Sequence, residues 1–347
     1  MTETISFSER DWRQLETLRA EYLTGAVSDW SDASTLDLYH QSFGQRIAWK
    51  WRAVLAEPAV ARLAPAAGPV VDLGCGSGVA SLECHAAGAV PADADWHLLD
   101  RSAVARAYAT DRLAEIGVRA HSDGRAPQGE IGTLIVSHVL SELDEKGLDE
   151  LVALASRASR VLVVEPGSRP AASELVALRE RLRAECDDLV PVAPCPHSGA
   201  CGLRAPNVAA NEGWCHHFAP PAPEAFTSGF WRRFSKRLGI DLRDLPMSFL
   251  VLARPDQAPA AASDDGLVPA RILGRPRVEK GRVRFELCWE EGVIEADLLK
   301  RTDPVLFRGL REPEAEPRAY RVELGARTGD ATRVTRIEPA TGSDTPQ

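Results

Sequence analysis

Residues 70–78 read VVDLGCGSG and predict the fold of this chain. The apolar run that ends at Leu73 is typical of a short buried strand, and a helical pattern over 79–87 follows directly after Gly78. Glycine at alternate positions permits positive φ angles and lets a ligand approach the main chain closely. Because the next helix begins with free N–H groups, the stretch is typical of a nucleotide-binding βα turn.

Short apolar runs alternate with helical stretches through the middle of the chain. The runs lie at residues 70–73, 97–100, 134–137, 161–164 and 249–252. Such alternation is typical of βαβ units and of a parallel sheet. We therefore predict an α/β fold with a Rossmann-like doubly wound sheet.

Composition changes divide the chain into regions. Residues 1–66 carry apolar positions at helical spacing and are predicted to form a helical N-terminal region. The α/β domain is predicted over 67–255, with a Cys-rich insertion at 186–223, and we expect residues 191–223 of it to be irregular. Three further segments complete the chain: a Pro- and Ala-rich linker at 256–266, a small β module at 267–325 and a polar tail at 326–347.

The overall composition is that of a globular protein, with 44% hydrophobic and 26% charged residues. No apolar run near the N-terminus resembles a signal peptide, and no run approaches the roughly 20 residues of a membrane span. We therefore expect a cytoplasmic protein without a membrane partner. The formal net charge of −9 argues against nucleic-acid binding in general, and we expect no DNA partner.

The glycine-rich turn differs in spacing from the Gly-x-Gly-x-x-Gly of dinucleotide enzymes. An acid before its first glycine and another at the end of the next apolar run make it resemble motif I and the ribose-binding acid of class I S-adenosylmethionine methyltransferases. The second acid, Asp100, would accept hydrogen bonds from both ribose hydroxyls, and Asp123 is expected near the adenine. A turn that binds no ligand is the alternative. The predicted cofactor-binding residues are Asp72, Gly74, Gly76, Gly78, Asp100 and Asp123.

The end of the next strand offers no clear catalytic residue. Residues 137–143 read SHVLSEL and lack the Asn-Pro-Pro-Tyr or Asp-Pro-Pro-Tyr signature of many base methyltransferases. His138 or Glu142 could act as a base. We favour the simpler interpretation, in which His138 faces the surface and Ser141 caps a helix.

Three of the seven cysteines lie in one irregular segment, with three histidines beside them. The odd count makes a disulfide framework improbable, whereas thiolates gathered in a loop are typical of a metal site. The pattern is Cys-x5-Cys-x13-Cys, so a fourth ligand must come from elsewhere. Zinc and an iron–sulfur cluster both remain open, as do three unrelated buried cysteines. The three cysteines are Cys195, Cys201 and Cys215, and the candidates for the fourth ligand are His197, His216, Cys186 and Cys288.

Basic residues concentrate in two stretches despite the negative net charge. Both contain few acids, and the first lies beside Phe230 and Trp231. Cations mixed with aromatic rings suit an RNA backbone and stacked bases, although a merely solvated basic face is the alternative. The residues are Arg232, Arg233, Lys236 and Arg237 in the first stretch, and Arg271, Arg275, Arg277, Lys280, Arg282 and Arg284 in the second.

Five motifs occur in succession: DLGCGSG at 72–78, SHVLSEL at 137–143, VVEPG at 163–167, PCPH at 194–197 and WCH at 214–216. In this order they resemble the methyltransferase-like family of mitochondrial small-ribosomal-subunit proteins and its bacterial relatives, over roughly residues 40–301. The resemblance implies a class I methyltransferase fold that binds S-adenosylmethionine through Gly74, Gly76 and Gly78. It also implies a [4Fe–4S] cluster held by Cys195, Cys201, Cys215 and Cys288.

The same resemblance implies a function in the assembly or translation of the small ribosomal subunit, with the subunit and its 16S-type rRNA as partners. The implied activity is S-adenosylmethionine-dependent methyl transfer, and a non-catalytic assembly factor is the alternative. A small-molecule or other RNA methyltransferase with a structural zinc site is a further hypothesis.

Overall fold

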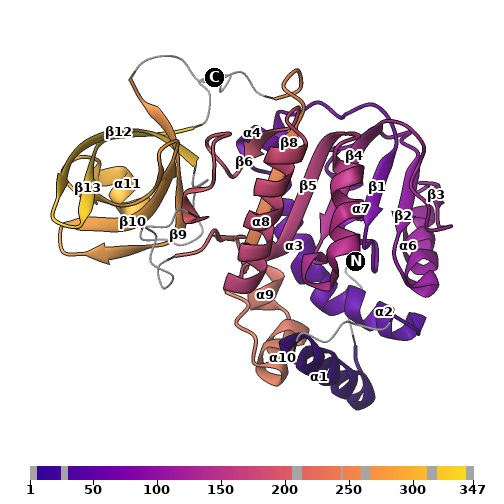
Figure 1. The fold of residues 1–347 in the computed structure, drawn as a ribbon. Helices are drawn as coiled ribbons and strands as arrows, with labels where there is room; N and C mark the ends of the chain where they lie inside the picture. Colours follow the sequence, from indigo (N-terminus) through magenta and orange to yellow (C-terminus); the bar gives the residue numbers. More distant parts are fainter. Residues whose placement is uncertain are drawn as a thin grey trace, which may run out of the picture. The chain divides into compact units, whose positions relative to one another are not determined.

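The computed structural model describes residues 6–24, 30–204, 213–243, 245–258, 266–310 and 319–340. The chain forms two compact units, coloured along the sequence in Figure 1. Unit 1 comprises Met1–Leu55, Pro65–Val164 and Ala219–Leu245. Unit 2 comprises Ala56–Ala64, Glu165–Phe218 and Pro246–Gln347.

Unit 1 contains a parallel sheet with the strand order β3-β2-β1-β4-β5. The order runs outward from β1 to β3 and then returns to β4, so the switch point lies between β1 and β4. Ligands of open α/β sheets bind at the carboxyl ends of the strands beside such a switch point. The strands are β1 (Val70–Leu73), β2 (Trp96–Leu99), β3 (Ala120–His121), β4 (Ile131–Ser137) and β5 (Ala158–Pro166).

Three helices connect these strands: α5 (Val79–Ala86), α6 (Ala103–Glu115) and α7 (Glu145–Ala155). The hydroxyl of Ser102 accepts from the amide of Ala105 and caps α6. The cap of α7 is Asp144, whose carboxylate accepts from the amide of Gly147 at 2.8 Å. The interpretation of Ser141 as a helix cap was therefore wrong, because Ser141 lies inside the short 3₁₀ helix η2 (Leu140–Glu142).

The helical N-terminal region predicted from sequence is confirmed. It contains α1 (Glu9–Thr24), α2 (Ala33–Tyr39), the π-helical turn η1 (His40–Gly44) and α3 (Gln45–Leu55). In Figure 1, α1 lies beside α10 (Gly229–Leu238), which follows the short helix α9 (Glu224–Thr227). Trp12 of α1 is buried between them and packs 5.5 Å from the ring of Phe230.

Unit 2 begins with α4 (Pro58–Ala61) and contains α8 (Arg169–Glu185) and β8 (Pro246–Ala253). Two short strands, β6 (Val190–Ala193) and β7 (His217–Phe218), pair antiparallel with β8. Both short strands belong to the Cys-rich insertion, whose residues 191–223 the sequence predicted to be irregular. That prediction was wrong at its two ends, where pairing with β8 imposes strand structure on Pro- and His-rich residues.

The C-terminal β module is a closed five-stranded barrel with the order β10-β11-β13-β12-β9. Its strands are β9 (Val268–Glu279), β10 (Arg282–Trp289), β11 (Gly292–Leu299), β12 (Ala319–Thr328) and β13 (Ala331–Pro339), and α11 (Pro304–Gly309) lies between β11 and β12. This strand order with one helix between the third and fourth strands is of the OB-fold type. Phe285, Leu298 and Val334 are among the side chains that fill the barrel.

The last strand, β13, lies in the stretch that the sequence predicted as a polar tail. Its buried residues Ala331, Val334 and Ile337 are three apart, because the ladder with β12 contains register shifts. The sequence therefore lacks the alternation of apolar and polar residues by which a strand is recognised.

The predicted fold class is confirmed: a Rossmann-like α/β sheet with a helical N-terminal region and a C-terminal β module. Within the described residues, no helix has both the length and the apolar character needed to cross a membrane.

Candidate cofactor and metal sites

The glycine-rich turn follows β1 at the switch point of the sheet. Gly74, Gly76 and Gly78 all have positive φ angles, of 73°, 49° and 74°. A Cβ atom on Gly74 would lie 2.6 Å from Val139, and one on Gly78 would lie 3.1 Å from Ala109. A Cβ atom on Gly76 would meet nothing closer than 4.0 Å. Gly74 and Gly78 are therefore needed for packing, whereas Gly76 borders open space that a ligand can fill.

Asp100 lies just beyond β2 and is tied to this turn. Its Oδ2 accepts from the amide of Gly76 at 3.0 Å, and its Oδ1 accepts from the amide of Ser102 at 2.8 Å. Each carboxylate oxygen has a second lone pair, so both can still accept from a hydroxyl. The structure thus brings together the glycine turn and the acid that the sequence proposed for the ribose.

Asp123 lies in the turn after β3, where it is exposed and accepts from the amide of Arg125 at 3.1 Å. The guanidinium of Arg106 connects this turn to the end of β2, because it donates to the carbonyls of both Ser122 and Asp100. The sequence did not identify Arg106 as part of the site, and only its place on the helix after Asp100 could have suggested it.

Asp72 is fully buried on β1, behind the turn. Its Oδ2 accepts from the hydroxyl of Ser81 on α5 at 2.6 Å, and its Oδ1 has no hydrogen-bond partner among the described residues. Burial raises the pKa of this carboxyl to about 7. Asp72 therefore links β1 to α5 by this hydrogen bond and stabilises the two elements that flank the glycine turn.

His138 follows β4 on the other side of the switch point. It is half-buried with a φ of 55°, so the favoured interpretation of a surface-facing histidine was wrong. Its Nε2 lies 3.3 Å from the ammonium of buried Lys50, and its Nδ1 is buried without a partner among the described residues. Burial and Lys50 hold the pKa of His138 well below its usual range. The neutral ring accepts from Lys50 at Nε2, so its proton lies on Nδ1.

Glu142, the other candidate base, lies in η2 and is partly exposed. Its carboxylate is 3.6 Å from the guanidinium of Arg101, and burial raises its pKa. The ring of His138 is thus held by Lys50, while Glu142 retains an ionisable carboxyl near the end of β4.

In unit 2, the four proposed cysteine ligands line one small cavity. Cys195, Cys201 and Cys215 come from the Cys-rich insertion, and Cys288 comes from β10 of the barrel. The insertion packs directly on the barrel: a Cβ atom on Gly202 would lie 2.6 Å from the Cα of Gly292. Segments far apart in the sequence therefore converge around the cavity.

The other candidate ligands are placed differently. His197 lines the same cavity, with Nε2 3.8 Å from the Sγ of Cys288. His216 is stacked on Trp214, and its Nδ1 lies 2.8 Å from the carbonyl of Trp214. Cys186 is buried at the end of α8 and does not line the cavity.

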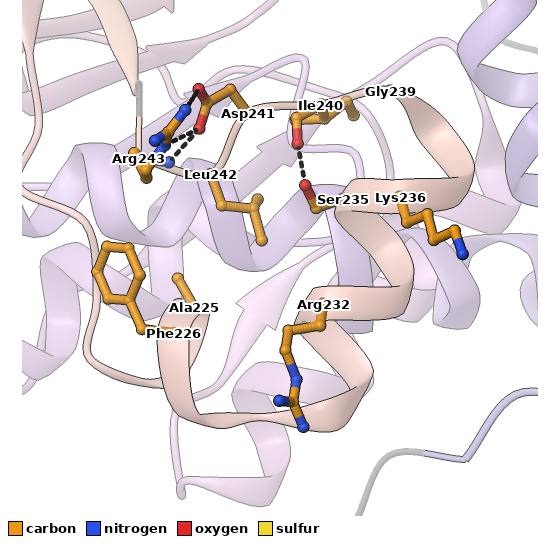
Figure 2. Close-up of a pocket in the computed structure, with 10 residues that line it drawn as sticks. All are labelled: Ala225, Phe226, Arg232, Ser235, Lys236, Gly239, Ile240, Asp241, Leu242 and Arg243. Carbon is orange, nitrogen blue, oxygen red and sulfur yellow. Dashed lines mark hydrogen bonds and ion pairs between the residues drawn. The ribbon is translucent and has the colours of Figure 1, made fainter.

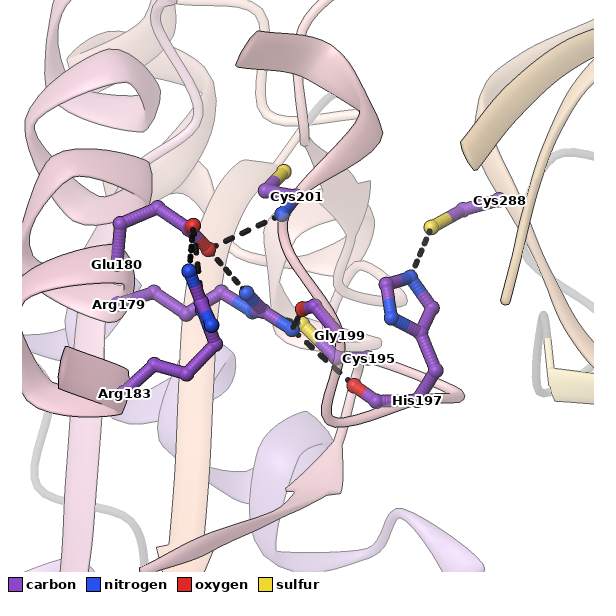
Figure 3. A network of polar contacts seen from close by, with 8 residues as sticks. All are labelled: Arg179, Glu180, Arg183, Cys195, His197, Gly199, Cys201 and Cys288. Carbon is purple, nitrogen blue, oxygen red and sulfur yellow. Dashed lines mark hydrogen bonds and ion pairs between the residues drawn. The ribbon is translucent and has the colours of Figure 1, made fainter. Parts of the chain in front are cut away.

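Arg179 on α8 organises the cysteine loop, as Figure 3 shows. Its guanidinium donates to the Sγ of Cys195 at 3.2 Å and to the carbonyls of His197 and Gly199 at 3.1 and 2.8 Å. The neighbouring Glu180 accepts from the amide of Cys201 at 3.0 Å. One turn of α8 therefore fixes the path of the loop that carries two of the cysteines.

Burial raises the pKa of all four thiols, and it raises that of Cys288 to about 12. The neighbouring thiols raise the pKa of Cys215 and Cys288 further, whereas Arg179 and Arg271 oppose the rise at Cys195. Four thiols in mutual range can lose their protons together only when positive charge enters among them. This donor set therefore suits a thiolate-bound metal centre.

The spacing of the thiols can be compared with that of a mononuclear zinc site. Sulfurs bound to one tetrahedral zinc ion at about 2.3 Å lie under about 4 Å apart. Among the described residues, no three of the cysteine sulfurs lie within 4.8 Å of one another. No three of these thiols therefore lie as close together as the sulfurs around one zinc ion.

Arg271 was assigned by sequence to a basic surface, but it is buried beside the cysteines. It forms a two-pronged ion pair with Glu57, at 2.9 and 2.8 Å. Arg277, Arg282 and Arg284 are also paired with acids, respectively Glu295, Glu279 and Asp330. Most of the second basic stretch is therefore neutralised within unit 2.

The first basic stretch, on α10, is divided between two faces. Arg233 and Arg237 form ion pairs with Glu9 of α1 and lie over the ring of Trp12. Trp231 is buried and therefore not available for stacking with bases, whereas Phe230 is partly buried in an aromatic cluster with Phe7 and Trp12.

The adjacent face of α10 carries Arg232 and Lys236, which line an open pocket of about 490 Å³ (Figure 2). Arg243 also borders it but is paired with Asp241 at 2.8 Å. Within the predicted basic surface, Arg232 and Lys236 are thus exposed and border this pocket.

Three solved structures to which the chain is similar are methyltransferases. Magnesium protoporphyrin IX methyltransferase from Synechocystis PCC 6803, with bound S-adenosylmethionine, has a TM-score of 0.36 and 12% identity, covering 72% of this chain and 100% of that chain. A putative RNA methyltransferase from Pyrococcus horikoshii has a TM-score of 0.35 and 10% identity, covering 71% and 98%. A plantazolicin methyltransferase in complex with S-adenosylhomocysteine has a TM-score of 0.37 and 13% identity, covering 71% and 98%. No curated protein matches the sequence.

The strand order β3-β2-β1-β4-β5, the glycine turn and Asp100 define a protein with a methyltransferase-like Rossmann fold. The model of one family, described as mitochondrial small ribosomal subunit Rsm22, matches residues 70–321. The chain belongs to the Rsm22 family, which confirms the family expected from its motifs.

Proposed function

We propose that this chain binds S-adenosylmethionine in unit 1 and a [4Fe–4S] cluster in unit 2, and that it acts on the small ribosomal subunit or its rRNA during assembly or translation. The observation that carries the cofactor assignment is the contact between the Gly76 amide and the Asp100 carboxylate, at the switch point of the sheet. The subunit assignment is supported by membership of the Rsm22 family.

The residues of unit 1 suit the cofactor. The open side of Gly76 leaves room that any Cβ atom would fill, and Asp100 would accept from the ribose hydroxyls. Asp72 would support the turn through Ser81, and Asp123 would lie on the side of the adenine. S-Adenosylmethionine supplies an electrophilic methyl group, whose transfer needs chiefly alignment of the acceptor and exclusion of water.

The acceptor side of the site is formed by the end of β4. There the ring of His138, held by Lys50, would border the acceptor. Ser137 is fixed by a hydrogen bond from the indole of Trp51 at 3.0 Å. Glu142 would receive a proton released by the acceptor.

The residues that would hold the cluster are Cys195, Cys201, Cys215 and Cys288. Their spacing favours a multinuclear cluster over a single zinc ion. Arg179 would balance the charge of the Cys195 thiolate and keep the loop in place. Because Cys288 belongs to the barrel, a bound cluster would fasten the insertion to the barrel within unit 2.

For the contact with rRNA we propose the pocket of Arg232 and Lys236. Barrels of the OB-fold type often bind oligonucleotides on their second and third strands. Here those strands are β10 and β11, where Arg282 and Arg284 are paired with acids and Cys288 faces the cysteine cavity. Arg232 and Lys236, which are exposed and form no ion pair with the described residues, are better placed to contact phosphates.

The cluster is tested by anaerobic purification followed by visible spectroscopy and analysis of iron and sulfide. Brown protein with about four irons per chain would support the cluster. Colourless protein that contains zinc would contradict it, and would instead support a methyltransferase with a structural zinc site.

The subunit function is tested by two measurements on the full chain. Co-sedimentation with small-subunit particles is expected, and transfer of labelled methyl groups to their rRNA would establish catalysis. Co-sedimentation without transfer would identify a non-catalytic assembly factor. If neither is observed, while a small molecule is methylated, the subunit assignment is wrong.

A further inference from the structure

A cluster of two histidines and an aspartate lies at the edge of the sheet in unit 1 and shares no residue with either site above. His97 on β2 and His121 on β3 are direct partners in the parallel register of these strands. Asp95 lies two residues before His97, so the two side chains leave the chain on the same face. The register between β2 and the edge strand β3 therefore brings together three side chains of types that bind metal ions.

The potential ligand atoms of these side chains converge. Nε2 of His97 lies 3.2 Å from Oδ2 of Asp95, and Nε2 of His121 lies 2.8 Å from Oδ1 of the same carboxylate. The three ligand atoms all lie within 4.8 Å of one another, and the two rings are stacked with centroids 4.6 Å apart. A single ion could reach all three with small changes in side-chain torsion.

Both ring nitrogens of His97 face oxygen atoms, and this arrangement favours a bound cation. Its Nδ1 lies 3.3 Å from the carbonyl oxygen of Arg125, and its Nε2 faces the carboxylate of Asp95. Both oxygens can only accept, whereas a neutral imidazole carries one N–H. One ring nitrogen therefore directs a lone pair at an oxygen unless a proton or a metal ion lies between them. The His97 side chain is 13% exposed, so water has little access to relieve this contact.

We propose that Asp95, His97 and His121 form a site for a divalent transition-metal ion of the zinc class. Two imidazole nitrogens and one carboxylate oxygen are ligands that such ions prefer. With the metal on Nε2, the Nδ1–H of His97 donates to the Arg125 carbonyl, which is the usual outer partner of a metal-bound histidine. The exposed carboxylate and His121 leave the remaining positions open to water.

The ion would hold the edge strand β3, which has only two residues, against β2. It would also hold the turn of Arg125, which Asp123 stabilises by accepting from the Arg125 amide. Metal binding is therefore expected to stabilise the turn proposed for the adenine side of the cofactor site.

Equilibrium dialysis of the full chain against micromolar zinc tests the proposal, with the metal centre of unit 2 kept in place. The variant H97Q/H121Q should bind one zinc ion fewer per chain than the wild type. His85→Gln, a histidine on α5 outside the cluster, is the matched control and should bind as many as the wild type. Equal zinc contents in wild type and double variant would overturn the site.

A second measurement covers the case in which the double variant folds poorly. Wild-type protein loaded with one equivalent of Cu²⁺ should show hyperfine coupling to imidazole nitrogen in its electron paramagnetic resonance spectrum. Asp95→Asn keeps both histidines and should weaken copper binding at least tenfold. A spectrum without nitrogen coupling, or unchanged affinity in Asp95→Asn, would overturn the proposal.

Discussion

The main-chain amide of Gly76 donates to the carboxylate of Asp100 at 3.0 Å, across the gap between two adjacent strands. The turn after β1 and the acid after β2 are thus held in one arrangement without a ligand. Little ordering is then required when the cofactor binds, and preorganisation of this kind favours affinity.

Gly76→Ala should remove cofactor binding without unfolding the chain. Alanine at a positive φ costs about 1–2 kcal/mol, and the new Cβ fills the open space beside the turn. S-Adenosylmethionine affinity, measured by calorimetry, should fall at least about tenfold. Gly117→Ala is the matched control, because Gly117 also has a positive φ and open surroundings but lies outside the site. Equal affinities in the two variants would contradict the assignment.

Asp72→Asn should change how stability depends on pH. The folded-state pKa of about 7 lies above the unfolded value, so the stability this carboxyl contributes is complete below about pH 4 and is lost as pH rises through 7. Asparagine does not ionise, so the stability of the variant does not fall in this way as pH rises. Relative to the wild type it should gain roughly 2–4 kcal/mol between pH 4 and pH 8.

Urea unfolding at several pH values measures this difference. Asp111→Asn, at an exposed position of α6, serves as the control and should differ from the wild type by a constant amount. A constant difference for Asp72→Asn as well would show that its carboxyl is not buried as described.

Glu57→Gln should destabilise unit 2 strongly. It leaves the Arg271 guanidinium, whose side chain is 3% exposed, without its charge partner. Breaking a buried pair in this way costs about 3–5 kcal/mol, whereas replacing both residues by methionine should cost less. Thermal unfolding followed by circular dichroism compares the variants. Asp241→Asn removes the exposed pair with Arg243 and should cost under about 1 kcal/mol.

Charge reversal on the open face of α10 should weaken RNA binding. Arg232→Glu with Lys236→Glu removes two phosphate contacts, so the affinity for small-subunit rRNA should fall and its salt dependence should decrease by a slope of about 1–2. The pair Arg62→Glu with Lys146→Glu changes the net charge equally at exposed positions elsewhere. Filter binding over a range of salt concentrations measures both. Equal losses in the two pairs would place the rRNA contact away from this pocket.

Local features of the sequence predicted the geometry of the glycine turn, although cofactor binding there stays a prediction. The strand, the glycines and Asp100 follow one another at fixed spacings, and a βα unit leaves little freedom in where they lie. The role of Asp72 beside the turn and the placement of the His138 ring could not be predicted. They depend on Ser81 and Lys50, which only the packing of α5 and α3 brings into contact.

The four cysteines predicted as ligands line one cavity, and their role as ligands stays a prediction. Three cysteines in one segment indicated a metal site, but no local pattern relates Cys288, Arg179 or Arg271 to that segment. For the basic stretches, the sequence predicted more exposed positive charge than the structure has. Positive charges were counted along the chain, whereas their acidic partners, such as Glu57 and Glu295, lie elsewhere in the sequence.

Helix α1 packs on α10 and places acidic side chains beside the basic residues of that helix. Glu9 and Glu16 neutralise Arg233 and Arg237, and Trp12 occupies the aromatic surface beside them. A chain that lost α1 would present four cations and a bare apolar ridge on one helix, and would adhere to polyanions of many kinds. The first helix thus covers half of the positive charge of α10 and leaves Arg232 and Lys236 exposed.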